Sequence, residues 1–196
     1  INDLRGPGNT ITQRDVSANM AVAEACRSIR SEAADAVLVG ATGTTLTTFN
    51  QMHARFEGEI SESEDVCRPF DKCRTGSASG EGAGAIVLEE MHSALRRGAR
   101  IYGEVLGAAS ASAVGLDRIA ACRTATASAM RQTLRRSGQS TASIGHIHAH
   151  GLGTRESDLA EAQSIRDIFG DLASKTPVIA AKGHLGNAAA GSGALE

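Results

Sequence analysis

The chain of 196 residues is long enough for one domain with a substantial core. Its formal charge of −2 and scattered basic residues argue against nucleic-acid binding, and no apolar run reaches the roughly 18 residues of a membrane span. The four cysteines form no Cys-x-x-Cys pair, so we interpret them as reduced thiols of a cytoplasmic protein, mostly with packing roles. Because the chain starts in an apparent loop and stops in an apparent helical turn, we expect a longer protein.

Helical and extended patterns alternate along the first part of the chain. Helical spacing of apolar residues over 16–30 predicts an amphipathic helix. The apolar run 34–40 predicts a strand buried on both faces. A short helix is expected over 49–56, followed by a solvated loop over 57–65.

Glycines at 80, 82 and 84 then lead into a predicted strand over 85–89. A phosphate-binding loop would need Gly-Lys-Ser/Thr before a helix, so this run does not favour a nucleotide site. The alternation continues without a linker and predicts an α/β fold. The remaining predicted elements are a short helix over 91–97 closed by Gly98, a strand over 101–107, helices over 124–136 and 157–169, and a strand over 178–180.

A histidine-rich strand ends in a glycine turn. His146, His148 and His150 alternate, so in an extended chain they would share one face. The turn at residues 151–154 would leave a strand-end side chain accessible, which is where α/β proteins often place reactive groups. These imidazoles with Asp158 would suit zinc and a metal hydrolase. The simpler alternative is one functional histidine beside two packed or exposed ones.

Several motifs occur together in a fixed order: Gly6-Pro7, Pro69-Phe70-Asp71, Arg74-Thr75-Gly76, the glycine run with its strand, His150-Gly-Leu-Gly-Thr154 and the downstream Lys182 and Glu196. In this order and spacing the chain resembles the β-ketoacyl synthases of the thiolase-like superfamily. The resemblance implies a partial five-layered α-β-α-β-α fold. It further implies that residues 1–107 are the later part of the N-terminal half and residues 108–196 the early part of the C-terminal half.

The resemblance also implies the site residues. In that family a Cys nucleophile takes the acyl chain as a thioester, and two histidines assist decarboxylation of a malonyl extender. His150 matches one of these histidines. Residues that match supporting positions are Thr154, Asp158, Glu161, Lys182 and Glu196. No cofactor and no metal is implied.

Two catalytic positions depart from the family pattern. Aligned without gaps over residues 6–25, the family's Thr-Ala-Cys falls on residues 13–15, so Asp15 holds the nucleophile position. Cys26 comes too late, and its helical register makes it a core residue. The spacing from Lys182 places Asn187, rather than His184, at the second histidine. An amide NH₂ can still donate a hydrogen bond to a carbonyl that becomes enolate-like.

Three hypotheses follow. The first is an acyltransferase that acts on acyl or malonyl thioesters of an acyl carrier protein, restricted to decarboxylation because Asp15 is a poor acyl acceptor. The second is a non-catalytic partner similar to a chain-length factor, and the third is the metal hydrolase. The resemblance implies a homodimer or a heterodimer with another ketosynthase.

Overall fold

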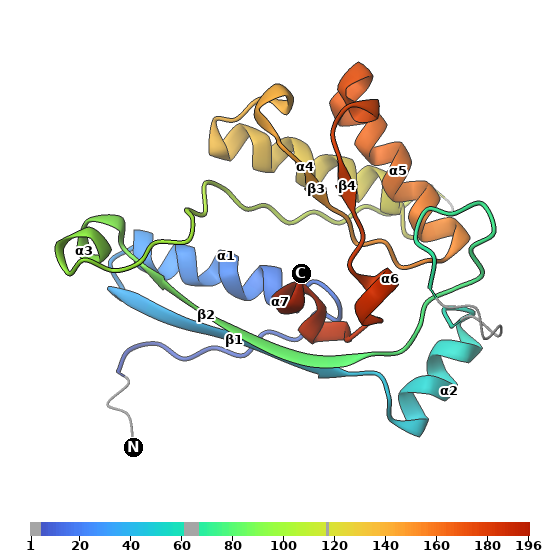
Figure 1. Ribbon diagram of the computed structural model, residues 1–196, viewed down its shortest axis with the longest axis horizontal. Coiled ribbons are helices and arrows are strands. Elements are labelled where there is room, and N and C mark those ends of the chain that lie inside the picture. Colours follow the sequence, from blue (N-terminus) through green and yellow to red (C-terminus); the bar gives the residue numbers. More distant parts are fainter. Residues whose placement is uncertain (1–4, 61–66, 117) are drawn as a thin grey trace.

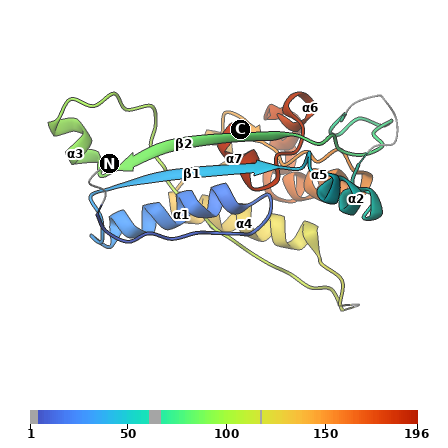
Figure 2. The same ribbon diagram turned by 90° about the horizontal axis from the view of Figure 1, so that it is seen from below.

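The computed structural model describes residues 5–60, 67–116 and 118–196. A long antiparallel pair of strands forms its spine: β1 (Ala36–Thr44) and β2 (Glu81–Glu89) pair in register from Ala36↔Glu89 to Thr44↔Glu81. Helix α1 (Ser17–Arg30) runs along one face of this pair, as Figures 1 and 2 show. The mixed helices and strands agree with the predicted α/β class.

Helix α1 confirms the first predicted helix. Its buried positions carry small side chains, Ser17, Ala18 and Ala25, which let the helix approach the strands closely. Arg27 and Arg30 occupy its last turn, where positive charge complements the helix dipole. The small buried side chains thus bring α1 close to the strands, and the arginines stabilise its C-terminal end.

The prediction of a strand buried on both faces is wrong for β1. The strand runs on to Thr44, its exposure alternates, and Val39 is its one buried residue. Leu38 and Val87, directly opposite each other in the register, are 59% and 63% exposed. An antiparallel pair with helices against one face has this alternation, whereas doubly buried strands belong to sheets covered on both sides.

Gly82 and Gly84 lie inside β2 rather than before it, which corrects the predicted start of this strand. A Cβ atom added at Gly82 would lie 2.6 Å from Leu195, and one at Gly84 would lie 2.5 Å from the carbonyl oxygen of Ala194. Both contacts come from helix α7 (Ser192–Leu195). The glycines thus permit close helix packing.

The second half is built on two packed helices, α4 (Cys122–Ser137) and α5 (Arg155–Phe169), as seen in Figure 1. Arg123 joins them, because its Nε and Nη2 both donate to the Asp167 carboxylate at 2.7 Å. Strands β3 (Ile147–His148) and β4 (Val178–Ile179) form a short parallel pair beside them. These elements confirm the predicted helices and both predicted strands, although the histidine strand is only two residues long.

The predicted strand over 101–107 is wrong, because the structure assigns these residues no strand. A groove of about 1060 Å³ lies between β2 and residues 99–105. The end of this segment packs on α4 instead, where Arg136 donates to the Ala108 carbonyl oxygen at 2.8 Å. Alternating side chains do not make a strand without a neighbouring backbone to pair with.

The shorter elements complete the described chain. The two short helices expected in the first half are present, and Gly98 follows the second with a φ of 67°. The loop expected over 57–65 lies partly outside the described residues. Among the residues described, no helix combines the length and apolar character needed to cross a membrane. The shorter elements are α2 (Thr48–Phe56), α3 (Met91–Arg96), η1 (Thr141–Ser143), η2 (Gly170–Ser174), α6 (Lys182–Leu185) and η3 (Ala189–Gly191).

Candidate active site

Two of the residues singled out from the sequence face each other across the fold. His150 follows strand β3, and Asp15 lies in the turn before α1. The Nε2 atom of His150 is 3.7 Å from Oδ2 of Asp15, and the two side chains are 36% and 23% exposed. This distance is within reach of an ion pair but longer than the roughly 3.2 Å limit of a strong hydrogen bond. Both side chains therefore face a place that solvent can enter.

The turn that presents Asp15 is tight. Arg14 has a φ of 49°, which is uncommon for a residue with a side chain. Ser17 holds this conformation, since its Oγ donates to the Arg14 carbonyl oxygen at 2.7 Å and accepts the Gln13 N–H at 2.7 Å. Strained backbone of this kind persists where the surrounding structure fixes it, and such residues cluster at functional sites.

The buried carboxylates of α5 hold the loop that carries His150. Glu161 accepts the backbone N–H of His150 at 2.7 Å and that of Gly151 at 2.9 Å. Asp158 accepts the N–H of Gly153 at 3.0 Å and that of Phe70 at 2.7 Å. Each carboxylate therefore accepts a backbone N–H with each of its two oxygens. In this arrangement neither acid presents a free oxygen to the site.

Arg74 balances the charge of Asp158. Its Nε lies 3.4 Å from Oδ2 of Asp158, whose side chain is fully buried. The same guanidinium donates to the carbonyl oxygens of Thr154 at 3.1 Å and Arg155 at 2.8 Å, at the start of α5. A buried carboxylate needs such a partner. Arg74 lies in the Arg-Thr-Gly motif, which was the one sequence signal for this role.

Thr154 is the N-cap of α5, and its side chain accepts the N–H of Ser157. The two glycines before it have positive φ, 49° at Gly151 and 86° at Gly153. A Cβ atom at Gly153 would lie 2.6 Å from the carbonyl oxygen of Gly76. The turn consequently requires glycine on both conformational and steric grounds.

Asn187 is nearly buried, with 9% of its surface exposed. Its Oδ1 accepts the N–H of Ala189 at 2.9 Å and the hydroxyl of Ser192 at 3.1 Å. Because these donors fix the amide oxygen, the NH₂ group is the part of this side chain that can donate to a ligand. His184, the alternative for this position, is exposed on α6.

Lys182 and Glu196 form a buried ion pair. The Nζ atom donates to Oε1 at 2.5 Å, and the two side chains are 2% and 16% exposed. The pair joins the start of α6 to the residue that follows α7. It thereby fixes the ends of the segment that carries Asn187.

The prediction that the cysteines mostly serve packing is wrong, because Cys67 alone is buried, Cys26 is half-buried, and Cys73 and Cys122 are exposed. The Sγ of Cys67 lies 3.6 Å from the carbonyl oxygen of Leu152, to which it donates. Burial raises the pKa of this thiol, and Asp158 adds to the effect. A thiol held neutral in this way is no replacement for a nucleophilic thiolate.

The three histidines do not form one cluster. His146 and His148 are exposed and lie edge to face with ring centroids 5.2 Å apart, whereas His150 faces Asp15. No group of three or more His, Cys, Asp or Glu side chains within the described ranges could hold a metal ion. Since Asp158 also bonds backbone amides, the geometry does not support the zinc alternative.

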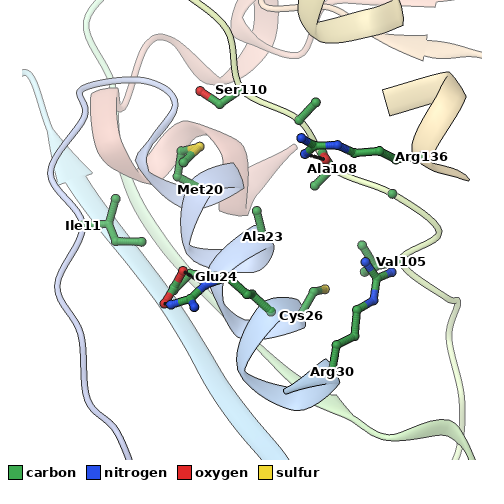
Figure 3. Close-up of a pocket in the computed structure, with 13 residues that line it drawn as sticks. Ile11, Met20, Ala23, Glu24, Cys26, Arg30, Val105, Ala108, Ser110 and Arg136 are labelled. Atoms are coloured by element: carbon green, nitrogen blue, oxygen red, sulfur yellow. Dashed lines mark hydrogen bonds and ion pairs between the residues drawn. The ribbon is translucent and has the colours of Figure 1, made fainter. Parts of the chain in front are cut away.

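A cavity of about 470 Å³ lies beside α1 and opposite residues 105–110 (Figure 3). Met20, Ala23 and Cys26 line its helical side, and Arg136 reaches it from α4. Neither Asp15 nor His150 is among its lining residues. The cavity is thus separate from the candidate site.

The family of this chain follows from its match to two family profiles. Two profiles match the chain, "Beta-ketoacyl synthase, N-terminal domain" over residues 1–94 and "Beta-ketoacyl synthase, C-terminal domain" over residues 102–196. The chain belongs to the β-ketoacyl synthase family. Members of this family share the thiolase-like fold, and the chain comprises part of it.

Curated ketosynthase relatives include enzymes of two kinds of pathway. A 3-oxoacyl-[acyl-carrier-protein] synthase 2 of Synechocystis is 31% identical over 98% of this chain and 47% of the relative. The putative β-ketoacyl synthase 1 of actinorhodin polyketide synthesis, from Streptomyces coelicolor, is 33% identical over 97% of this chain and 42% of the relative. The chain spans about half the length of the curated relatives it matches.

Solved ketosynthases have the same arrangement of elements. The type II polyketide ketosynthase AntDE, in complex with its acyl carrier protein AntF, has a TM-score of 0.87 at 27% identity, with 95% of this chain and 47% of that chain covered. The ishigamide ketosynthase/chain length factor has a TM-score of 0.80 at 34% identity, with 95% and 45% covered.

Proposed function

We propose that this chain is part of a ketosynthase-family acyltransferase of fatty-acid or polyketide biosynthesis that handles malonyl and acyl thioesters on an acyl carrier protein. In this proposal the protein does not catalyse condensation but still decarboxylates malonyl thioesters. The observation that carries the proposal is the carboxylate of Asp15, 3.7 Å from Nε2 of His150. The ungapped alignment assigns Asp15 to the position of the family's cysteine.

The chemistry of Asp15 argues against condensation. Acyl transfer from a thioester to a carboxylate would form a mixed anhydride, which is a more reactive acyl group than the thioester. A thiolate, by contrast, exchanges one thioester for another at little cost. Asp15 therefore cannot store the acyl group that condensation requires.

Decarboxylation needs no nucleophile from the protein. The C–C bond to the malonyl carboxylate breaks, carbon dioxide leaves, and the electron pair moves into an enolate of the thioester. We propose that His150 Nε2–H and the Asn187 NH₂ donate hydrogen bonds to the enolate oxygen. The enolate carbon then takes a proton from solvent water, which gives an acetyl thioester.

The remaining site residues position these two donors. In the proposed site Glu161, Asp158 and Thr154 hold the loop of His150, and the Lys182–Glu196 pair holds the segment of Asn187. The hydrogen bonds of each residue support this assignment. Buried acceptors that fix a catalytic loop typically matter as much as the groups they orient.

The proposed partner is an acyl carrier protein, and the proposed assembly is a dimer with itself or with another ketosynthase in the cytoplasm. The carrier complex of AntDE and the ketosynthase/chain length factor pair support both partners by analogy. We further propose that the chain passes from the N-terminal to the C-terminal half of the fold near residue 107. The two profiles change over slightly earlier, between residues 94 and 102.

The test uses purified full-length protein and malonyl carrier protein. Carbon dioxide and acetyl carrier protein should appear together, and His150→Ala should abolish both. His146→Ala is the matched control, because His146 is exposed and lies outside the proposed site. If the wild type releases no more carbon dioxide than the His150→Ala variant, the proposal fails.

A second candidate is a non-catalytic partner similar to a chain-length factor. It is favoured by the missing thiol at Asp15, and by the 34% identity to a ketosynthase/chain length factor structure. Affinity purification from the native host tests it. Recovery of a homologue with an intact cysteine in equal amount would support this candidate, whereas a protein recovered only with itself would contradict it.

A further inference from the structure

Asp15 differs in its surroundings from the other acids of the site. Asp158 and Glu161 are buried, and each binds two backbone amides through its two oxygens. Asp15 is instead partly exposed, and its Oδ2 faces the ring of His150. Of these three carboxylates, Asp15 is the one that faces the imidazole of His150.

The separation of Asp15 and His150 suits a shared small molecule. At 3.7 Å the two atoms lie beyond a direct strong hydrogen bond. A water molecule within about 2.8 Å of each atom fits this spacing. In the free site such a water would contact both groups. When a thioester binds, the single Nε2–H of His150 turns to the carbonyl oxygen, and the carboxylate of Asp15 keeps the water.

We infer that Asp15 is a general base for water, and that this site hydrolyses acyl thioesters that have no carboxylate to lose. The inference rests on the proposed function only for its substrate class, a carrier-bound thioester. It assigns a second reaction to the site, with water in place of the missing thiol as the nucleophile.

The step balances as follows. The water oxygen forms a bond to the thioester carbonyl carbon while Oδ2 of Asp15 takes a water proton. The carbonyl π electrons move to the oxygen, where His150 and Asn187 donate hydrogen bonds to the developing charge. The C–S bond then breaks, and the leaving thiolate takes the proton from Asp15. The products are one carboxylic acid and one carrier thiol.

The first experiment compares wild type with Asp15→Asn on a saturated acyl carrier thioester, such as the octanoyl derivative. Release of octanoic acid is measured by mass spectrometry, which avoids thiol reagents that would also label Cys73 and Cys122. Because general-base catalysis contributes about 10²- to 10⁴-fold, the variant should lose at least about 100-fold in rate. Asp171→Asn, an exposed Asp in η2, is the matched control and should hydrolyse at the wild-type rate.

Two results would overturn the inference: no acid release above buffer from the wild type, or an equal rate from Asp15→Asn. Thermal melting of the variant shows whether it is folded. The saturated substrate cannot decarboxylate, so acid release is independent of the carbon dioxide assay. If the protein releases carbon dioxide from the malonyl thioester but no acid from the octanoyl thioester, only the role of Asp15 as a base is rejected. If it releases the acid but no carbon dioxide, only the proposed decarboxylation is rejected.

A second experiment needs no variant. In a single turnover in ¹⁸O-labelled water, a general base places the label in the released acid. Were Asp15 a nucleophile and the anhydride opened by water at the Asp15 carboxyl, the label would enter the peptide that contains Asp15. Unlabelled Asp15 with labelled acid is the expected result, and labelled Asp15 would overturn the inference.

Discussion

Glu161 accepts the backbone N–H of His150 at 2.7 Å, so an acid on α5 sets the position of a histidine that follows β3. The other Glu161 oxygen accepts the N–H of Gly151. One carboxylate thus satisfies two adjacent backbone amides of the turn that follows β3. The buried charge has a positional role in the loop.

Glu161→Gln tests this role. An amide has one acceptor oxygen, so one of the two N–H groups should lose its partner and meet an NH₂ instead. We expect a loss of about 1.5–3 kcal/mol in the free energy of unfolding by urea, as for hydrogen bonds to a charged group. Carbon dioxide release should fall as well, because His150 loses its support. Glu156→Gln, exposed in the first turn of the same helix, should cost less than about 1 kcal/mol through the helix dipole and leave carbon dioxide release unchanged.

Asp15→Cys tests whether Asp15 holds the nucleophile position. A thiol there lies next to the start of α1 and faces His150, and both favour the thiolate. Incubation with an acyl carrier thioester should add the mass of one acyl group to the peptide containing residue 15. Asp15→Ser, which cannot form a thiolate, should stay unmodified. An unmodified Cys variant of normal stability would contradict the alignment of this position.

The Lys182–Glu196 pair should be strongly coupled because both side chains are largely buried. Lys182→Met leaves the Glu196 carboxylate without its partner, and we expect a loss of about 3–5 kcal/mol in unfolding free energy. Adding Glu196→Gln removes the unpaired charge and should recover part of this loss. A double-mutant cycle in urea measures the coupling. Strictly additive losses would show that the two residues act separately.

The N-terminus of α3 should respond to acid. Hydrogen bonds from the His92 N–H, the His92 ring and the Ser93 N–H lower the pKa of Glu90 to about 2, well below its ordinary value of 4.5. The folded-state pKa lies below the unfolded one, so this stabilisation is present above the unfolded pKa and is lost as pH falls toward 2. The carboxyl ¹³C shift of Glu90 should titrate in this range.

Glu90→Gln removes the titrating group and should reduce the acid sensitivity of the His92 and Ser93 amide signals, whose N–H groups bond Glu90. Glu32→Gln, exposed after α1, serves as the control and should preserve that sensitivity. Titration of Glu90 near its unfolded pKa would contradict the capping interaction.

The sequence by itself determined the helices over 16–30, 124–136 and 157–169, because helical spacing and capping residues are local properties. Its motif order also predicted that Asp15 and His150 belong to one site, and their side chains lie 3.7 Å apart in the structure. Tertiary structure decided what local pattern could not. Residues 101–107 alternate like a strand but do not form one, and the glycines of β2 serve helix packing.

The roles of the carboxylates were likewise decided by the fold. Asp158, Glu161 and Asp15 are all acids near the site, and no local pattern distinguishes their roles. In the structure two of them bind backbone amides of the turns around His150, and Asp15 alone of the three faces its ring. Hydrogen-bond partners far apart in the chain are fixed only when the elements pack, and these partners decide whether a carboxylate holds a loop or faces the imidazole of His150.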